Sequence, residues 1–283
     1  MRIVNTIREM QSLAESFRTQ RKKIGVVPTM GYLHAGHVSL IKTARELSDV
    51  VITTIFVNPT QFGPSEDFER YPRDFERDQK LASDAGADII FSPLQDEMYA
   101  PGFGTYVEVE DISKALEGKF RPTHFRGVTT IVAKLLNITK PHVAVFGQKD
   151  AQQAFLIRKM AADLNFDVSI IIAPIVREAD GLALSSRNVY LNLDERQRAT
   201  ALYKSLKRAE LLINQGERSA DKLHIEMEKI LTDANPTQVD YIVFVNPDSF
   251  KEVGTLTPPA VLVALAVRFD STRLIDNMIM KIA

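Results

Sequence analysis

The feature that most constrains the fold is a strand-to-helix turn near the start of the chain. Residues 24–27 form an apolar run typical of a buried parallel strand. Residues 40–47 then repeat apolar side chains at helical spacing. The connection between them contains Gly31 and Gly36, which allow a tight turn and a close approach to a ligand. A helix that begins here points its N–H groups and positive dipole end at that ligand, so the turn predicts a βαβ unit with an anion site.

Two histidines lie in this turn, three residues apart. His34 and His37 can share one face of the first helical turn and donate hydrogen bonds to oxygens that gain charge during a transfer reaction. Two alternatives are that the histidines lie on the surface without a role, or that they form part of a metal site. A zinc site would need carboxylates from elsewhere, because the chain has no cysteine and only five histidines. On this stretch alone these alternatives stay open beside phosphate binding.

Strands and helices alternate from the N-terminus to about residue 175. We expect strands over residues 24–27, 50–57, 88–91, 143–146 and 168–173. We expect helices over residues 6–20 and 128–137. Two more helices are expected, one that follows the loop at residues 65–72 and ends near residue 85, and one that follows residues 147–150 and ends near residue 164. Residues 106–109 are a further candidate strand, and residues 112–116 a helical turn. This alternation with short loops favours an α/β fold, a doubly wound, Rossmann-like parallel sheet with right-handed crossovers.

The alternation ends after Pro174, and a smaller α+β domain is predicted to follow. We expect a long helix capped by Asp194 and running to about Asn214, and a second helix over residues 220–232. Strands are expected over residues 239–245 and 261–267, followed by residues 274–277. The predicted boundary divides the chain into residues 1–175 and residues 176–283.

Composition narrows the class of protein. The formal net charge of −1 provides no overall field for nucleic acid or for an anionic membrane. No apolar run is long enough to span a bilayer, and the first residues lack the hydrophobic region of a signal peptide. The absence of cysteine fits the cytoplasm. We therefore expect a cytoplasmic protein that binds neither nucleic acid nor membrane.

Two further motifs carry groups suited to phosphates. Lys149 directly follows the strand over residues 143–146, where it can act as a point charge on a phosphate. A solvated lysine at a helix start is the alternative, and Asp150 can cap that helix. The Ser-Ser-Arg sequence at residues 185–187 combines two hydroxyls with a guanidinium in one loop, which makes a compact phosphate clamp. Alone it is a weak signal, because such tripeptides are common in loops.

Two glutamines are candidates for binding a small polar ligand at the edge of the sheet. Gln61 lies in the loop that ends the strand over residues 50–57, and Gln153 lies in the first turn of the helix after Lys149. A neutral amide can hydrogen-bond both a hydroxyl and a carboxylate. A surface position is the alternative for either glutamine taken alone.

Taken together, these segments resemble one known family. The sequence His-Ala-Gly-His at residues 34–37 is similar to the His-x-Gly-His signature of the nucleotidyltransferase superfamily, which also includes class I aminoacyl-tRNA synthetases. Within that superfamily, the chain resembles the pantothenate synthetase family over nearly its whole length. The resemblance lies in residues 28–37, 58–62, 71–73, 121–128, 147–153, 180–188 and 273–277. Two departures are Ala35, where an acidic residue is common, and Gln148, where Glu or Lys is common.

The resemblance implies an AMP-forming ligase that joins an acid to an amino acid through a C–N bond. The expected reaction is ATP-dependent condensation of (R)-pantoate with β-alanine through a pantoyl adenylate, a step of pantothenate and coenzyme A biosynthesis. Residues 1–175 would bind ATP and pantoate, and residues 176–283 would form a lid. Mg²⁺ would accompany ATP without an assigned protein ligand. A homodimer is expected from the family alone.

The resemblance also implies the roles of individual residues. The expected catalytic groups are His34, His37, Lys149, Ser185, Ser186 and Arg187. The expected ATP-binding residues are Met30, Gly31, Tyr32, Leu33, His34, Ala35, Gly36, His37, Gly147, Gln148, Lys149, Asp150, Val176, Leu184, Ser185, Ser186 and Arg187. Pantoate and β-alanine would be bound by Gln61 and Gln153.

Two other functions are open at this point. A nucleotidyltransferase that attaches AMP or CMP to a phosphorylated acceptor would share the histidines and the Ser-Ser-Arg sequence, but it would need a basic acceptor pocket rather than two glutamines. A non-catalytic nucleotide sensor would not need both histidines and Lys149. An adenylate would have to be shielded from water, and the loop over residues 62–71 and the second domain are the expected covers.

Overall fold

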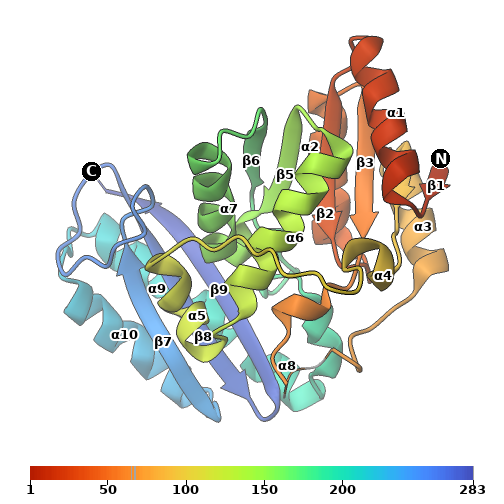
Figure 1. Cartoon of the computed structure of the whole chain (residues 1–283). Helices are drawn as coiled ribbons and strands as arrows, with labels where there is room; N and C mark the ends of the chain where they lie inside the picture. The colour runs from red at the N-terminus through yellow and green to blue at the C-terminus, as the bar shows by residue number, and fades with distance from the viewer. Residues whose placement is uncertain (65, 67, 283) are drawn as a thin grey trace. The chain divides into compact units, whose positions relative to one another are not determined.

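The computed structural model describes residues 1–64, 66 and 68–282 (Figure 1). The chain divides into two compact units. The N-terminal unit comprises Met1–Gln148 and Gln152–Pro174, and the C-terminal unit comprises Lys149–Ala151 and Ile175–Ala283. Lys149, Asp150 and Ala151 therefore belong to the C-terminal unit, although the chain on both sides of them belongs to the N-terminal one.

The N-terminal unit is built on a six-stranded parallel sheet with the order β1-β4-β3-β2-β5-β6. Its strands are β1 (Arg2–Val4), β2 (Ile24–Thr29), β3 (Val50–Ile55), β4 (Ile89–Phe91), β5 (Val143–Gly147) and β6 (Ser169–Ala173). From β2 the chain builds outward through β3 and β4, and it then returns to the other side of β2 for β5 and β6. The strand order therefore reverses between β2 and β5, and open α/β sheets bind their ligands at such a point.

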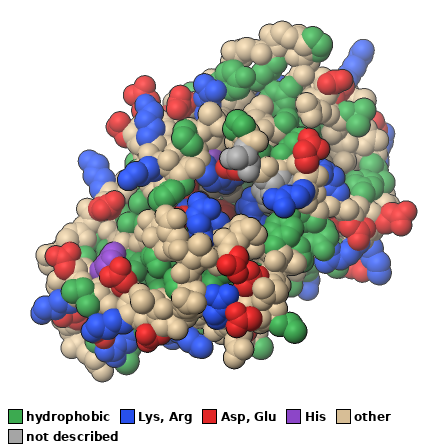
Figure 2. Space-filling view, turned by 90° about the horizontal axis from the view of Figure 1, so that it is seen from below, with side chains coloured by type: hydrophobic (Ala, Val, Ile, Leu, Met, Phe, Trp, Pro, Cys, Tyr) green, Lys and Arg blue, Asp and Glu red, His purple; other side chains and the backbone are tan. Residues whose placement is uncertain are grey.

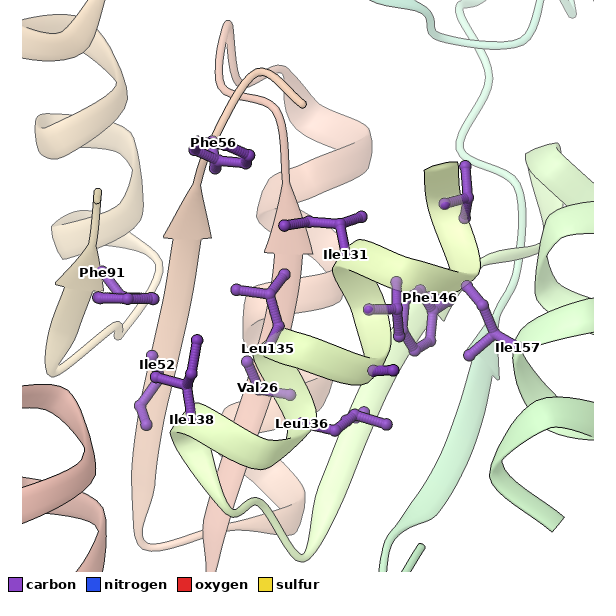
Figure 3. Close-up of a cluster of buried hydrophobic side chains, with 14 of the residues drawn as sticks. Val26, Ile52, Phe56, Phe91, Ile131, Leu135, Leu136, Ile138, Phe146 and Ile157 are labelled. Atoms are coloured by element: carbon purple, nitrogen blue, oxygen red, sulfur yellow. The ribbon is translucent and has the colours of Figure 1, made fainter. Parts of the chain in front are cut away.

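Helices pack on both faces of this sheet. They are α1 (Ile7–Thr19), α2 (Ala35–Leu47), α3 (Phe75–Asp84), α4 (Gln95–Met98), α6 (His124–Thr139) and α7 (Ala151–Asp163). The short α5 (Glu117–Phe120) lies in the same unit. Strand residues alternate between the two faces, so that Val26 joins the core beneath α1, α6 and α7, whereas Val27 joins the core beneath α2 and α3. Figure 3 shows Ile131, Leu135 and Ile138 of α6 packed on the sheet. Burial of both faces explains why these strands are continuously apolar.

The C-terminal unit has a three-stranded antiparallel sheet with the order β7-β8-β9, two long helices and one short helix. The strands are β7 (Gln238–Val245), β8 (Ala260–Phe269) and β9 (Thr272–Lys281), and the helices are α8 (Leu193–Arg198), α9 (Ala201–Asn214) and α10 (Ala220–Asp233). Leu206 of α9 and Met227 of α10 are fully buried in one cluster with Leu265 of β8. The two units confirm the predicted α/β class with a smaller α+β part.

The long helix expected from residue 194 to residue 214 is wrong, because the structure has two helices there. Asn192, not Asp194, caps α8: its Oδ1 accepts from the backbone N–H of Glu195 at 2.9 Å, and the Glu195 carboxylate accepts from the N–H of Asn192 at 2.7 Å. Asp194 instead pairs with Arg198. The hydroxyl of Thr200 donates to the Gln197 carbonyl at the break between α8 and α9, which competes with continuous helix.

Three other expectations need correction. Residues 106–109 are not a strand, because the N–H of Val107 donates to the Thr130 hydroxyl and its carbonyl accepts from the Thr129 hydroxyl. Side chains of α6 thus replace a partner strand. Helix α6 begins at His124, four residues before the expected start. Strand β1 was not expected, because three residues are too short to show a period.

In the described part of the chain, no helix combines the length and the apolar character that a membrane span requires.

Candidate active site

The β2–α2 turn places both histidines at the start of α2. His34 is the N-cap residue, and its Nδ1 accepts from the backbone N–H of Gly36 at 3.1 Å. The Nδ1 atom of His37 in turn accepts from the backbone N–H of His34 at 3.3 Å. The centroids of the two imidazole rings lie 4.1 Å apart. The predicted pairing of the histidines on the first turn is therefore confirmed as a geometric arrangement.

Asp78 of α3 holds the backbone ahead of these histidines. Its carboxylate accepts from the N–H groups of Tyr32 at 2.7 Å and Leu33 at 2.6 Å. Only 1% of Asp78 is exposed, and burial raises the pKa of its carboxyl. Gly31 has φ of +84°, and a Cβ there would lie 2.9 Å from Asp78 Oδ2. Sequence reasoning missed Asp78. Its signal was a lone acid on the apolar stripe of α3, in helical register with Leu81 and Ala82.

Gln61 lies in the 3₁₀ helix η1 (Pro59–Gln61), which follows β3, and its side chain is held at both ends. Its Oε1 accepts from Asn58 Nδ2 at 3.2 Å, and its Nε2 lies 2.8 Å from the sulfur of Met30. Asn58 is 1% exposed and also donates to the carbonyl of Gly127 at 3.1 Å. A Cβ on Gly127 would lie 2.4 Å from the Thr60 carbonyl oxygen, so only glycine fits. The structure thus brings Gln61 beside the β2–α2 turn.

The backbone of Gln61 is fixed by a second set of groups. Its carbonyl oxygen accepts from His124 Nδ1 at 2.9 Å, which places the proton of the neutral ring on that nitrogen. The other nitrogen, Nε2, lies 3.1 Å from Arg121 Nη1, which can only donate. Burial, and then the charge of Arg121, lowers the pKa of His124 to about 4. Arg121 is itself paired with the Glu66 carboxylate through two hydrogen bonds of 2.7 and 2.5 Å.

The β5–α7 connection lies on the other side of the point where the strand order reverses. Gly147 ends β5, the strand that pairs with β2, and Gln148 begins the 3₁₀ helix η3 (Gln148–Asp150). Gln153 is half-buried in the first turn of α7. Because parallel strands end at one edge of a sheet, these residues lie at the same edge as His34 and Gln61.

The remaining site residues predicted from the sequence lie in the C-terminal unit. Lys149 is half-buried, and its Nζ lies 3.6 Å from Asp150 Oδ1. Val176 and Leu184 face each other in a short hairpin, where the N–H of Leu184 donates to the Val176 carbonyl. Ser185 follows this hairpin and caps the 3₁₀ helix η4 (Ser186–Tyr190), with its hydroxyl accepting from the N–H of Arg187.

Charge on the face shown in Figure 2 is mixed. Figure 2 shows acidic side chains lying between basic ones across the face that it presents, consistent with the net charge of −1. Among the described residues, no group of three or more His, Asp or Glu side chains is placed to hold a metal ion.

The fold and the turn define a class of protein, a doubly wound α/β protein with a His-x-Gly-His helix start at the point of strand reversal, where such folds bind ligands. The family model for pantoate-beta-alanine ligase matches residues 2–279. The chain belongs to this pantoate-beta-alanine ligase family.

Similar proteins cover the whole chain. The pantothenate synthetase of Thermotoga petrophila is 55% identical over 280 residues, which are 99% of this chain and 100% of the relative. The pantothenate synthetase of Chloroherpeton thalassium is 56% identical, over 98% of both chains.

Two solved structures are similar as well. A pantothenate synthetase from Thermus thermophilus has a TM-score of 0.93 and 42% identity, covering 98% of this chain and 99% of its own. A pantoate-beta-alanine ligase from Francisella tularensis, complexed with beta-gamma ATP and beta-alanine, has a TM-score of 0.81 and 35% identity, covering 98% and 97%.

Proposed function

We propose that this protein condenses (R)-pantoate with β-alanine at the expense of ATP, releasing AMP and pyrophosphate and forming pantothenate. One observation carries the proposal. The family match extends over residues 2–279, and within it the two histidines and Gln61 lie at the sheet edge where such folds bind ligands. The complex of the Francisella tularensis relative with beta-gamma ATP and beta-alanine supports ATP and β-alanine as two of the three substrates.

The reaction has two chemical steps. In the first, a carboxylate oxygen of pantoate attacks the α-phosphorus of ATP, and the bond from that phosphorus to the bridging oxygen of the leaving pyrophosphate breaks. In the second, the amine of β-alanine attacks the acyl carbon and loses a proton, and the C–O bond to AMP breaks. The first step is needed because a free carboxylate is a poor acylating agent, whereas AMP is a good leaving group.

The residues divide into two groups under this proposal. His34 and His37 would donate hydrogen bonds to phosphate oxygens as charge develops on them, because their Nδ1 atoms accept from the backbone. Lys149 and the residues at 185–187 would hold and neutralise the triphosphate. The other ATP-binding residues named above would line the nucleotide, and Gln61 and Gln153 would bind pantoate and β-alanine.

Three further points belong to the proposal. Mg²⁺ would be held mainly by phosphate oxygens and water, and it would neutralise charge on the leaving pyrophosphate. Residues 1–175 would bind the substrates, and residues 176–283 would act as a lid. The protein would be a cytoplasmic homodimer. It would have no nucleic-acid or membrane partners, which the net charge of −1 supports.

The test is a product assay. The protein is incubated with ATP, MgCl₂, (R)-pantoate and β-alanine, and AMP, pyrophosphate and pantothenate are quantified by mass spectrometry. Equal amounts of all three are expected, and none with (S)-pantoate. Transfer of AMP to an acceptor without amide formation would indicate a nucleotidyltransferase, and ATP binding without turnover would indicate a sensor.

A further inference from the structure

The segment at residues 273–277 resembles the family but has no role in the site described so far. It lies on the edge strand β9, and it contains Asp276 and Asn277, each 2% exposed. Burying two adjacent polar side chains at the edge of a sheet is costly unless both are hydrogen-bonded. Their partners therefore show what the segment holds.

Asn277 holds the segment that carries Lys149. Its Nδ2 donates to the carbonyl oxygen of Lys149 at 2.9 Å. This bond fixes the backbone from which the Lys149 side chain extends, and both residues belong to the C-terminal unit. The Lys149 segment is thereby tied to β9, 128 residues further along the chain.

Asp276 holds the hairpin that leads into residues 185–187. Its carboxylate makes two hydrogen bonds with Arg177, of 2.6 and 2.9 Å, in the fork geometry that fixes a guanidinium. Arg177 also donates to the carbonyl of Gly181 at 3.0 Å and lies 4.5 Å from the centroid of the Tyr203 ring. Arg177 pairs across the hairpin with Ala183, two residues before Ser185.

The two anchors point in opposite directions. Consecutive side chains of a strand lie on opposite faces, and the register confirms this for β9. Asp276 lies opposite Leu265, which belongs to the core under the helices, whereas Asn277 lies opposite Ala264, which does not. One strand therefore holds one phosphate-binding segment on each of its faces.

We propose that Asp276 and Asn277 are positioning residues that set the distance between Lys149 and the Ser185–Ser186–Arg187 clamp. The inference rests on the proposed function for the roles of those groups. The Lys149 segment and the clamp can neutralise one triphosphate together only if both are held in fixed geometry. The two residues therefore act on adenylation and not on the later attack by β-alanine, which breaks no phosphate–phosphate bond.

The experiment compares the two half-reactions in Asn277→Ala and in Asn277→Asp, which has the same shape but lacks the donor. Adenylation is measured as pantoate-dependent exchange of labelled pyrophosphate into ATP. Aminolysis is measured as single-turnover attack of β-alanine on preformed pantoyl adenylate. We expect exchange to fall by about 10- to 100-fold, the scale of one lost buried hydrogen bond, and aminolysis to change by less than about twofold.

The matched control is Asp240→Asn in the same sheet. Asp240 is a buried carboxylate that pairs with Arg268 and Arg273, and within the described part of the chain it has no hydrogen bond to either phosphate-binding segment. This variant should lose thermal stability while keeping both half-reactions at wild-type rates. Equal slowing of both half-reactions in Asn277→Ala, unchanged exchange in it, or the same kinetic defect in Asp240→Asn would overturn the inference.

A binding measurement separates this inference from the proposed function. Calorimetric titration with MgATP alone needs no turnover, and Asn277→Ala should weaken ATP binding by about tenfold while Asp240→Asn leaves it unchanged. A wild-type protein that binds ATP but shows no exchange would contradict the proposed function. Unchanged ATP affinity in Asn277→Ala would contradict the positioning role.

Discussion

His34 and His37 use the same ring atom, Nδ1, to accept hydrogen bonds from the backbone at the start of α2. A neutral imidazole has one donor nitrogen and one acceptor nitrogen, so acceptance at Nδ1 places the proton on Nε2 in both rings. The rings lie 4.1 Å apart between centroids. The helix start therefore provides two Nε2–H donors side by side, in addition to its own dipole.

This arrangement predicts different effects for three substitutions of His37. His37→Ala should slow adenylation by about 10²- to 10³-fold, the usual loss for one transition-state donor. His37→Gln, whose amide reaches the place of Nε2, should retain more activity than His37→Asn, whose amide reaches only the place of Nδ1. Pyrophosphate exchange measures the rates, and ATP affinity should change much less. Normal exchange in His37→Ala would remove the residue from the mechanism.

Asp78→Asn should weaken both stability and adenylation. The carboxylate accepts two backbone N–H groups, from Tyr32 and Leu33, and an amide can accept only one of them without turning a donor toward the other. We expect the free energy of unfolding in urea to fall by about 1–3 kcal/mol, the cost of a buried unsatisfied group.

Asp84→Asn on the same helix is the control. Asp84 is exposed and pairs with Lys80, so its loss should change stability by less than about 1 kcal/mol and leave exchange unaltered. If Asp78→Asn behaved like this control, the β2–α2 turn would not depend on Asp78.

The sequence predicted the parts of this site that local patterns encode. The strand, the turn and the helix start around His34 are contiguous, and their period and glycines are visible within about 25 residues. Groups that reach the turn from distant segments were missed. Asp78 is 45 residues from Leu33, and His124 is 63 residues from Gln61, so no local period records either contact.

The helix boundaries failed for a related reason. A run of polar residues around Asp194 offers several possible caps, and only the reciprocal bonds between Asn192 and Glu195 select one of them. Likewise, residues 106–109 have the composition of a strand but pair with hydroxyl groups of α6. Composition indicates that a backbone can adopt an extended conformation. It does not indicate which groups will form hydrogen bonds with that backbone.

Gln61→Ala should impair recognition of pantoate selectively. The Gln61 amide is oriented by Asn58 on one side and by Met30 on the other, and under the proposed function it binds pantoate. We expect the KM for pantoate to rise at least about tenfold, because a buried hydrogen bond to substrate is lost, while ATP affinity stays near the wild-type value. Gln153→Ala should act in the same direction. A collapse of ATP binding in either variant would assign that residue to the nucleotide.

The lowered pKa of His124 predicts a specific loss of stability in acid. Burial, and then the neighbouring Arg121, lowers its pKa in the folded protein to about 4, below the ordinary value of 6.5. Between these values the unfolded chain binds a proton that the folded protein does not bind. The contribution of His124 to the free energy of unfolding is therefore fully present above pH 6.5. It is lost as pH falls toward 4, by about 3 kcal/mol in all.

The measurement compares urea denaturation of the wild type and of His124→Asn from about pH 7.5 to about pH 4, a range that spans the titration of the unfolded and folded states. The Asn amide can still donate to the Gln61 carbonyl, but it does not titrate in this range. The difference in unfolding free energy between the two proteins should shrink as pH falls. Parallel pH profiles would show that His124 is not held neutral by the fold.

The two half-reactions should be separable, because the site residues described above include no activated nucleophile for an acyl-enzyme. The chain has no cysteine, and the Ser185 hydroxyl already accepts from the backbone N–H of Arg187 at the start of η4. ATP and pantoate alone should therefore support exchange of labelled pyrophosphate into ATP. β-Alanine should then discharge the intermediate, and ¹⁸O from the pantoate carboxylate should appear in AMP, because that oxygen remains on phosphorus when the acyl C–O bond breaks. An exchange that strictly required β-alanine, or AMP without the label, would rule out the pantoyl adenylate and favour a concerted attack.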